Sequence, residues 1–326
     1  MDDIQKQPAL PPGPLAEAYA RLLTVYAPTR RHKEVRLAIE SVLRSAGTAS
    51  GHQGLAIIGP SGSGKTTAVA HAENWLRTQM SLDPYAPSPL PTVLMTTRSS
   101  GKSLSNSFLK AGGDPVAAIR SQNDAEMLLK AAAPTMSVVA FAIDEFHHCF
   151  ASKSERGARE MAMSVKTIVN SLAKPVIVMG IDGLEDFIDA DRELSQRFES
   201  KVYLDDPGIS TDAEVEDMRL VLHMLKAVLP CDPSCDLDNG DMLVRLLVAA
   251  QLRFGSVIHR VRKACQFGAM QSQPAVTLEN FSAAYREAAP RNKRSDEHNP
   301  FKQDIKTVRV QLSRLSIEVN RSRPAR

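Results

Sequence analysis

Residues 59–66 read Gly-Pro-Ser-Gly-Ser-Gly-Lys-Thr, the complete G-x-x-x-x-G-K-[ST] pattern of a phosphate-binding loop. Because glycine has no Cβ, the backbone N–H groups of such a loop can turn inward and surround a polyphosphate. The helix that follows adds the positive end of its dipole. Lys65 supplies a point charge for the β- and γ-phosphates, and the Thr66 hydroxyl is placed to bind Mg²⁺. The predicted nucleotide-binding residues are Gly59, Pro60, Ser61, Gly62, Ser63, Gly64, Lys65, Thr66, Thr67 and Asp144.

A pair of acidic residues, Asp144 and Glu145, ends the apolar run at residues 137–143. This is the pattern of a Walker B element, so Asp144 joins Thr66 as a predicted magnesium ligand. Glu145 is placed to orient and deprotonate an attacking water. A solvated turn is the other interpretation of such a pair, but its position after a phosphate loop favours the functional one. Glu145 and Lys65 are therefore predicted catalytic residues, and the adjacent glutamate indicates hydrolysis of ATP.

His147, His148 and Cys149 follow the acidic pair and are of metal-ligating types. Three nearly consecutive side chains are not expected to face one ion. We therefore favour a switch segment beside the γ-phosphate, or ordinary packing, over a metal site.

Two arginines, Arg192 and Arg197, lie in a short predicted helix just before the last predicted strand. In oligomeric ATPases with this layout, an arginine here enters the nucleotide site of the neighbouring subunit and stabilises the charge of the transition state. Arg197 is the predicted trans finger and Arg192 the second choice, with a surface salt bridge as the alternative. If the finger interpretation holds, hydrolysis requires assembly.

The chain has 326 residues, 43% hydrophobic and 24% charged, as in a soluble globular protein of about two domains. It has no apolar run long enough for a transmembrane helix and no signal-peptide pattern, so we expect a cytoplasmic protein without membrane contact. The four cysteines are too scattered to predict a disulfide framework. The net charge is only +3, but residues 291–326 carry ten basic and four acidic residues. Such a tail favours nucleic acid or acidic partners, or is simply solvated.

Five apolar runs read as strands, and helical stretches separate most of them. This alternation predicts an α/β fold with a parallel five-stranded sheet flanked by helices. Ligands of such sheets bind beyond the carboxyl ends of the strands, where Gly59 and Asp144 fall. The predicted strands are residues 55–58, 92–97, 138–143, 175–180 and 201–204, and after residue 207 only helices are predicted, at residues 212–229, 241–252, 256–270 and 278–288.

We expect four parts along the chain. They are an N-terminal extension with an adenine-side helix (residues 1–50), an α/β nucleotide-binding domain (51–206), a helical lid (207–289) and a basic C-terminal tail (290–326). Within the first part, residues 15–26 and 33–44 have helical spacing. Tyr26, Pro28 and His32 are candidates for the adenine pocket.

These features together resemble the AAA+ ATPases, which implies a P-loop AAA+ core with a small C-terminal helical lid, and ATP and Mg²⁺ as cofactors. The lid holds a candidate sensor-2 region at residues 254–262. Its basic residues are Arg260 and Arg262, whereas many AAA+ lids place an arginine at the position that Ile258 occupies here. A polar sensor-1 residue is expected where Ile181 stands, with Asp182 beside it.

Several segments resemble the TniB/TnsC family of transposition regulators, namely residues 26–31, 58–66, 143–148, 174–180 and 194–199. The resemblance implies an ATP-dependent homo-oligomer, a ring or a filament, on double-stranded DNA without sequence preference. It would link a target-selection protein of the TniQ type to a DDE transposase, and ATP hydrolysis would disassemble it.

The same resemblance implies DNA contacts from the loop after the second strand, with Arg98, Lys102 and Ser103 as the DNA-binding residues. Cations and hydroxyl donors suit phosphate contact. Lys153 and Arg156 are a second possibility, and a solvated polar loop is the alternative.

Two other functions fit the same core. One is an AAA+ helicase loader or replication initiator, although residues 290–326 read as too short and polar for an added helix-turn-helix. The other is a nucleotide-binding signalling module with little turnover, which the irregular sensors favour and which Glu145 and Arg197 disfavour.

Overall fold

The computed structural model describes residues 10–46, 54–97, 99–113, 121–150, 154–204 and 211–322. The chain forms two compact units, which are described separately below. Residues 30–205 form an α/β unit, and residues 1–29 and 206–326 together form a helical unit. The two halves of the expected N-terminal extension therefore fall in different units, with the change after Thr29.

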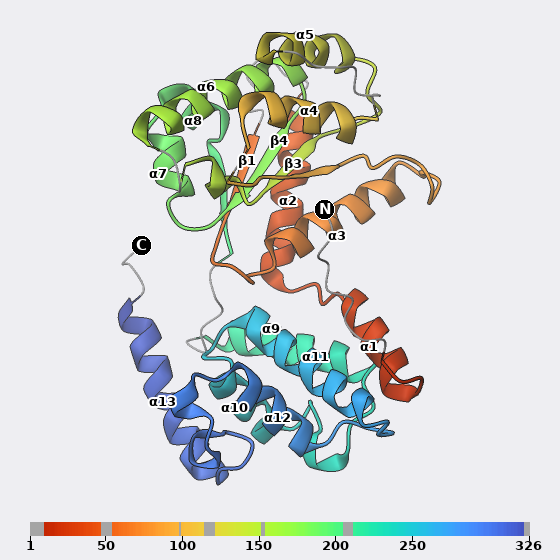
Figure 1. Ribbon diagram of the computed structural model, residues 1–326, viewed down its shortest axis with the longest axis vertical. Helices are drawn as coiled ribbons and strands as arrows, with labels where there is room; N and C mark the ends of the chain where they lie inside the picture. Colours follow the sequence, from red (N-terminus) through yellow and green to blue (C-terminus); the bar gives the residue numbers. More distant parts are fainter. Residues whose placement is uncertain are drawn as a thin grey trace. The chain divides into compact units, whose positions relative to one another are not determined.

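The α/β unit is built on one parallel sheet of five strands in the order β2-β3-β4-β1-β5 (Figure 1). The strands are β1 Gly54–Ile58, β2 Thr92–Leu94, β3 Phe141–Asp144, β4 Val176–Gly180 and β5 Ser200–Tyr203. All five strands predicted from apolar runs are present. Because the strands are parallel, their carboxyl ends share one edge, and the turns after β1, β3 and β4 meet there.

Helices cover both faces of this sheet, and the alternation along β1 shows how (Figure 1). Leu55 and Ile57 pack in one core with α2 and α3, whereas Ala56 and Ile58 pack in a second core with α4, α5 and α6. The helices of this unit are α2 Arg30–Ser45, α3 Lys65–Gln79, α4 Gly101–Ala111, α5 Gln122–Ala132, α6 Glu155–Leu172, α7 Leu184–Asp189 and α8 Arg192–Arg197, with a short 3₁₀ helix η1 at Phe146–Cys149.

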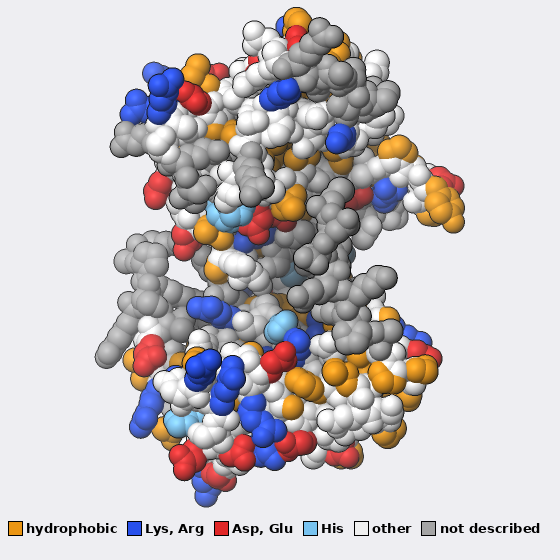
Figure 2. All heavy atoms as spheres, viewed as in Figure 1, with side chains coloured by type: hydrophobic (Ala, Val, Ile, Leu, Met, Phe, Trp, Pro, Cys, Tyr) orange, Lys and Arg blue, Asp and Glu red, His pale blue; other side chains and the backbone are white. Residues whose placement is uncertain are grey.

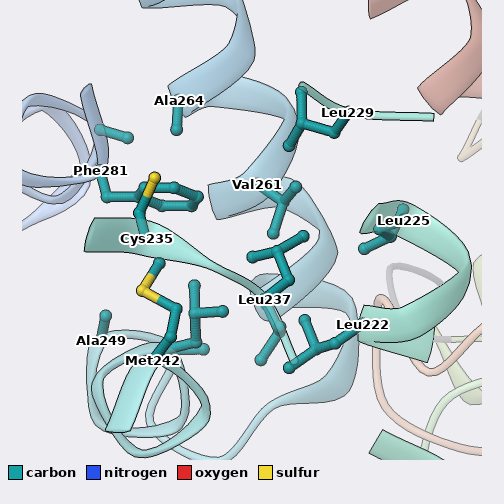
Figure 3. Close-up of a cluster of buried hydrophobic side chains, with 14 of the residues drawn as sticks. Leu222, Leu225, Leu229, Cys235, Leu237, Met242, Ala249, Val261, Ala264 and Phe281 are labelled. Atoms are coloured by element: carbon teal, nitrogen blue, oxygen red, sulfur yellow. The ribbon is translucent and has the colours of Figure 1, made fainter. Parts of the chain in front are cut away.

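The helical unit has its own core (Figure 3), to which Leu222, Leu237, Val261 and Phe281 all belong. Helix α1 joins this core: the Leu22 carbonyl accepts from the Arg262 guanidinium at 3.0 Å. The helices are α1 Pro14–Thr24, α9 Asp212–Lys226, α10 Gly240–Ala249, α11 Phe254–Met270, α12 Leu278–Ala288 and α13 Ile305–Ser322, with 3₁₀ helices η2 Pro233–Cys235, η3 Arg291–Lys293 and η4 Asp296–His298.

The basic C-terminal segment is folded as far as residue 322. Phe301 and Val308 are buried in the helical unit, and the Arg245 guanidinium donates to the Gln303 carbonyl at 2.9 Å. Arg309 pairs with Asp241 at 2.8 Å, which ties α13 to α10. For these residues the alternative of a simply solvated tail does not apply, because Phe301 and Val308 anchor an otherwise charged segment. Lys and Arg side chains gather over this part of the helical unit (Figure 2).

Within the described residues, no single helix is long and apolar enough to cross a membrane. Only α10 and α11 taken together pass that test of length and composition, and they are bent by 106°.

Candidate nucleotide site

The loop between β1 and α3 has the backbone that a phosphate cradle requires. Gly62 and Gly64 have φ angles of +81° and +92°, which side chains with a Cβ rarely adopt. A Cβ at Gly59 would lie 2.3 Å from the Leu204 carbonyl oxygen, so only glycine fits there. The Gly59 N–H donates to the Gly180 carbonyl at 3.1 Å, which holds the loop against the end of β4.

Two polar side chains of this loop are buried. Lys65 is 8% exposed, and its amine donates to the carbonyls of Gly59 and Pro60 at 2.7 and 2.8 Å. Ser63 is 9% exposed, and its hydroxyl has no hydrogen-bond partner within the described part of the chain. A buried hydroxyl without a partner is costly, and a phosphate oxygen would satisfy it.

The predicted magnesium ligands lie side by side. The Thr66 hydroxyl donates to Asp144 Oδ2 at 2.6 Å, although 78 positions separate the two residues. The other carboxylate oxygen of Asp144 accepts the Glu145 N–H at 2.8 Å. Hydroxyl and carboxylate oxygens are the ligands that Mg²⁺ prefers, so the donor set fits this ion.

Glu145 leaves the strand in a strained conformation, with φ +55°. Its carboxylate is partly exposed, and one oxygen lies 3.2 Å from Nδ1 of His147. His147 is 9% exposed, and burial lowers the pKa of its imidazole, an effect that His148 strengthens and the Glu145 charge opposes. The two carboxylates after β3 therefore face different surroundings, with Asp144 against Thr66 and Glu145 against His147.

Of the adenine candidates, His32 lies against the loop. A Cβ on Gly64 would be 2.7 Å from His32 Nε2, so the start of α2 contacts the phosphate-binding turn. Tyr26 and Pro28 belong to the helical unit. The sequence signal that singled out all three was only their position upstream of β1.

Arg197 ends α8, and its carbonyl oxygen would lie 2.9 Å from a Cβ on Gly54. Gly54 is the first residue of β1, whereas the phosphate loop follows Ile58, the last residue of this strand. At about 3.3 Å per residue, the five-residue strand separates Arg197 from its own phosphate loop by about 15 Å. Arg192, at the other end of α8, is exposed.

The sensor-2 candidates make contacts inside the helical unit. Arg260 donates to the carbonyls of Ala284 and Ala249 at 2.9 and 3.2 Å and lies over the Tyr285 ring. Arg262 bonds the end of α1, as described above. Both guanidinium groups thus hold helices together, which accounts for their place in the sequence. Asp182, beside the expected sensor-1 position, is exposed after β4.

Of the predicted DNA-binding residues, Lys102 and Ser103 lie at the start of α4. Lys102 is in its first turn, and Arg98 lies outside the described residues, as does Lys153. The Ser103 hydroxyl accepts the Ser100 N–H at 2.7 Å as half of a capping box. Arg156 is exposed and pairs with Glu160 at 2.9 Å.

A family model described as "Bacterial TniB protein" matches residues 26–205, more than half of the chain. The chain belongs to the TniB family. The match spans the phosphate loop, the acidic pair and Arg197, and so covers the α/β unit of this TniB-family chain. No curated protein matches it significantly.

Solved structures resemble both units of this TniB-family chain. ORC1 of Aeropyrum pernix in complex with DNA matches with a TM-score of 0.59 at 14% identity, over 92% of this chain and 87% of that one. Drosophila ORC bound to DNA matches with a TM-score of 0.54 at 15% identity, over 100% of this chain and 85% of that one. Aeropyrum pernix ORC2 in ADPNP-ADP complexes matches with a TM-score of 0.54 at 11% identity, over 90% of this chain and 81% of that one. The likeness confirms the AAA+ fold, with its parallel five-stranded sheet and helical C-terminal region.

Proposed function

We propose that the protein is an ATP-driven transposition regulator that assembles on duplex DNA and releases it on hydrolysis. The observation that carries the proposal is the contact between Thr66 and Asp144, with Glu145 directly after, in a chain of the TniB family. This contact brings together, across the sheet edge, the hydroxyl and the carboxylate that would hold the Mg²⁺ of Mg–ATP.

In the proposed reaction, the loop amides and the Ser63 hydroxyl hold the phosphates, and Lys65 leaves its loop carbonyls to meet them. Bound Mg²⁺ would neutralise charge on the β- and γ-phosphates. Glu145 orients the attacking water and accepts its proton. Its partial exposure leaves the carboxylate reachable by water, whereas Asp144 is buried at 8% exposure.

Arg197 is proposed to act on a neighbouring subunit. Since about 15 Å of strand β1 separates it from its own phosphate loop, it is not placed to reach a nucleotide bound by the same chain. A neighbour that receives Arg197 would complete its site only in the assembly. ATP would thereby stabilise the oligomer, and hydrolysis would weaken it.

The DNA contact is proposed at the start of α4, where the Lys102 charge and the positive end of the helix dipole can meet a phosphate. The Ser103 hydroxyl would have to exchange its capping bonds to take part, so Lys102 and Arg98 carry most of this proposal. Such contacts give DNA binding without sequence preference, and this binding weakens as the salt concentration rises. The proposed partners are a DDE transposase and a TniQ-type target-selection protein.

The test is ATP turnover with and without duplex DNA. We expect DNA to raise turnover, and Glu145→Gln to abolish it while leaving ATP-dependent complexes on DNA that sediment as oligomers. If the ATP turnover rate is the same with and without DNA, and the protein stays monomeric in the presence of ATP, the proposal is overturned. Lys102→Glu should reduce DNA binding at least tenfold at low salt, with Lys263→Glu in the helical unit as the matched control.

A helicase loader or replication initiator is the second candidate, because ORC proteins resemble this chain over both units. Capture by a transposase, as against a replicative helicase, separates the two functions.

A further inference from the structure

We propose that Glu145, His147 and His148 form a second metal site, which takes a transition-metal dication such as Zn²⁺. One ligand atom from each residue lies within 4.8 Å of the other two. Thr66 and Asp144, proposed for Mg²⁺, are not part of this set. The site is distinct in its donors and goes beyond the proposed ATPase function.

Backbone geometry brings these three residues together. η1 begins after Glu145, and the His148 N–H donates to the Glu145 carbonyl at 3.0 Å. This turn, together with the positive φ of Glu145, brings positions 145 and 148 close together. We did not expect His147, His148 and Cys149 to face one ion, and the present set differs because it joins Glu145 to two of these residues.

One ligand of the site is already desolvated and has an unused nitrogen. His147 is nine-tenths buried, and its Nδ1 has no hydrogen-bond partner among the described residues. This atom lies 3.2 Å from Glu145 Oε2, close but not aligned for a hydrogen bond. The ring of His148 is 4.3 Å away, centre to centre. A cation held between the three side chains would satisfy the buried nitrogen.

Aromatic packing holds the segment in place. Phe146 is buried and meets the Phe187 ring edge-on at 6.0 Å, and Phe150 stacks on the same ring at 4.7 Å. Both ends of the 3₁₀ turn are thereby fixed to α7. A preset ligand geometry favours metal binding because little is lost in ordering the side chains.

The donor set selects the class of metal. Two imidazoles and one carboxylate suit Zn²⁺, Ni²⁺ or Cu²⁺, whereas Mg²⁺ prefers oxygen ligands. Three protein ligands leave a fourth position for water. The charge of Lys65 nearby opposes a dication, while the charges of Glu145 and Asp144 favour it.

The consequence for turnover depends on the proposed function. A metal on Glu145 would occupy the carboxylate that acts as base, so micromolar Zn²⁺ would inhibit hydrolysis without competing for the Mg²⁺ ligands. Inhibition would then persist when Mg²⁺ is raised.

The first experiment titrates Co²⁺ into the nucleotide-free full-length protein and follows visible absorption. We expect one site per chain, not displaced by excess Mg²⁺ but displaced by Zn²⁺. His148→Ala, which changes a half-buried residue, should weaken binding at least tenfold, as should His147→Ala. His259→Ala in the helical unit should leave it unchanged. Equal binding by wild type and the His148→Ala variant, with both shown to be folded by circular dichroism, would overturn the site.

The second experiment measures Zn²⁺ inhibition of ATP turnover in wild type and His148→Ala. Weaker inhibition of the variant, by at least tenfold in Zn²⁺ concentration, supports the regulatory consequence, and equal inhibition contradicts it. Absence of turnover in every protein would refute the ATPase proposal alone, because the Co²⁺ titration does not depend on it.

Discussion

At the residue scale, the two carboxylates after β3 have different neighbours. Asp144 accepts from a hydroxyl and a backbone N–H, so both of its oxygens are held. Glu145 faces His147 and water. This difference supports the proposed roles, metal binding for the first and proton transfer for the second, since a general base must be reachable by the water that it activates.

Removing the Ser63 hydroxyl should have different effects on the stability of the nucleotide-free protein and on its affinity for ATP. Its buried hydroxyl has no partner within the described residues, so Ser63→Ala should leave the stability of the nucleotide-free protein unchanged or raise it by up to about 1 kcal/mol. The same change should weaken ATP binding about fivefold to thirtyfold, because it removes one hydrogen bond to a charged phosphate.

Thermal melts and calorimetry measure the two effects. Thr78→Ala, which removes an exposed hydroxyl near the end of α3 and away from the phosphate loop, is the matched control. A destabilised apoprotein with unchanged ATP affinity would mean that Ser63 is only structural.

The sequence could predict most of this site, because the loop pattern fixes both the backbone and the residue types. It could not predict the grouping of Glu145, His147 and His148, because that depends on the positive φ of Glu145. No residue preference signals that angle: glutamate rarely adopts it, and only tertiary packing imposes it.

At the element scale, one lysine of β5 ties this strand to α7, and α7 is tied in turn to α8. Lys201 donates to both oxygens of Asp189 at 2.8 Å and to Glu185 at 3.3 Å, and the Tyr203 hydroxyl also donates to Glu185. Ser195 of α8 donates to Asp189 at 3.2 Å. This network holds the short helix that carries Arg197.

The network has a defined pH dependence. The bond from Tyr203 lowers the pKa of Glu185, and the bond from Lys201 lowers that of Asp189. Burial would lower the pKa of Lys201, but its bonds to Asp189 and Glu185 outweigh burial and raise it. The carboxylates therefore stabilise the fold above their unfolded pKa and lose this as the pH falls through the lower folded values. The lysine contribution is complete below its unfolded pKa and is lost only at higher pH.

Lys201→Met should lower the free energy of unfolding by about 1 kcal/mol, discounted because the side chains of Glu185 and Asp189 are 42% and 45% exposed. The loss should be constant between about pH 5 and pH 10 and shrink below about pH 4. Urea unfolding at several pH values measures it. Lys263→Met, which breaks a single exposed ion pair, is the control. If the free energy of unfolding lost in Lys201→Met stays the same at acid pH, the network does not act as described.

The five strands could be predicted because buried parallel strands are short apolar runs with clear ends. Helix α13 could not be predicted from the sequence, since its composition is polar and only Val308 among its described side chains is fully buried. Likewise, the spacing of α1 predicts a helix but not its packing on α11, which depends on contacts across more than 200 positions, such as that of Arg262 with Leu22.

At the scale of the whole molecule, the proposed role of Arg197 in a neighbouring subunit would make activity a property of the assembly. Arg197→Ala and Glu145→Gln should each reduce turnover about 10³-fold when alone. Mixed before ATP is added, the two variants should recover activity well above their sum, because an intact Glu145 in one subunit meets an intact Arg197 from its neighbour.

Steady-state turnover across mixing ratios measures this recovery. The variant Arg192→Ala, changed at the exposed start of α8, should be active alone. If the mixture stays as inactive as its parts while nucleotide binding is normal, Arg197 does not act in trans.

The proposed hydrolysis, assembly and release all require the folded protein to bind Mg–ATP, and calorimetry can measure this binding. Calorimetry should show one ATP per chain with micromolar or tighter affinity, abolished in Lys65→Ala and retained in Lys174→Ala, whose amine bonds carbonyls remote from the loop. Equal uptake by wild type and Lys65→Ala, or no uptake by either, would contradict the account.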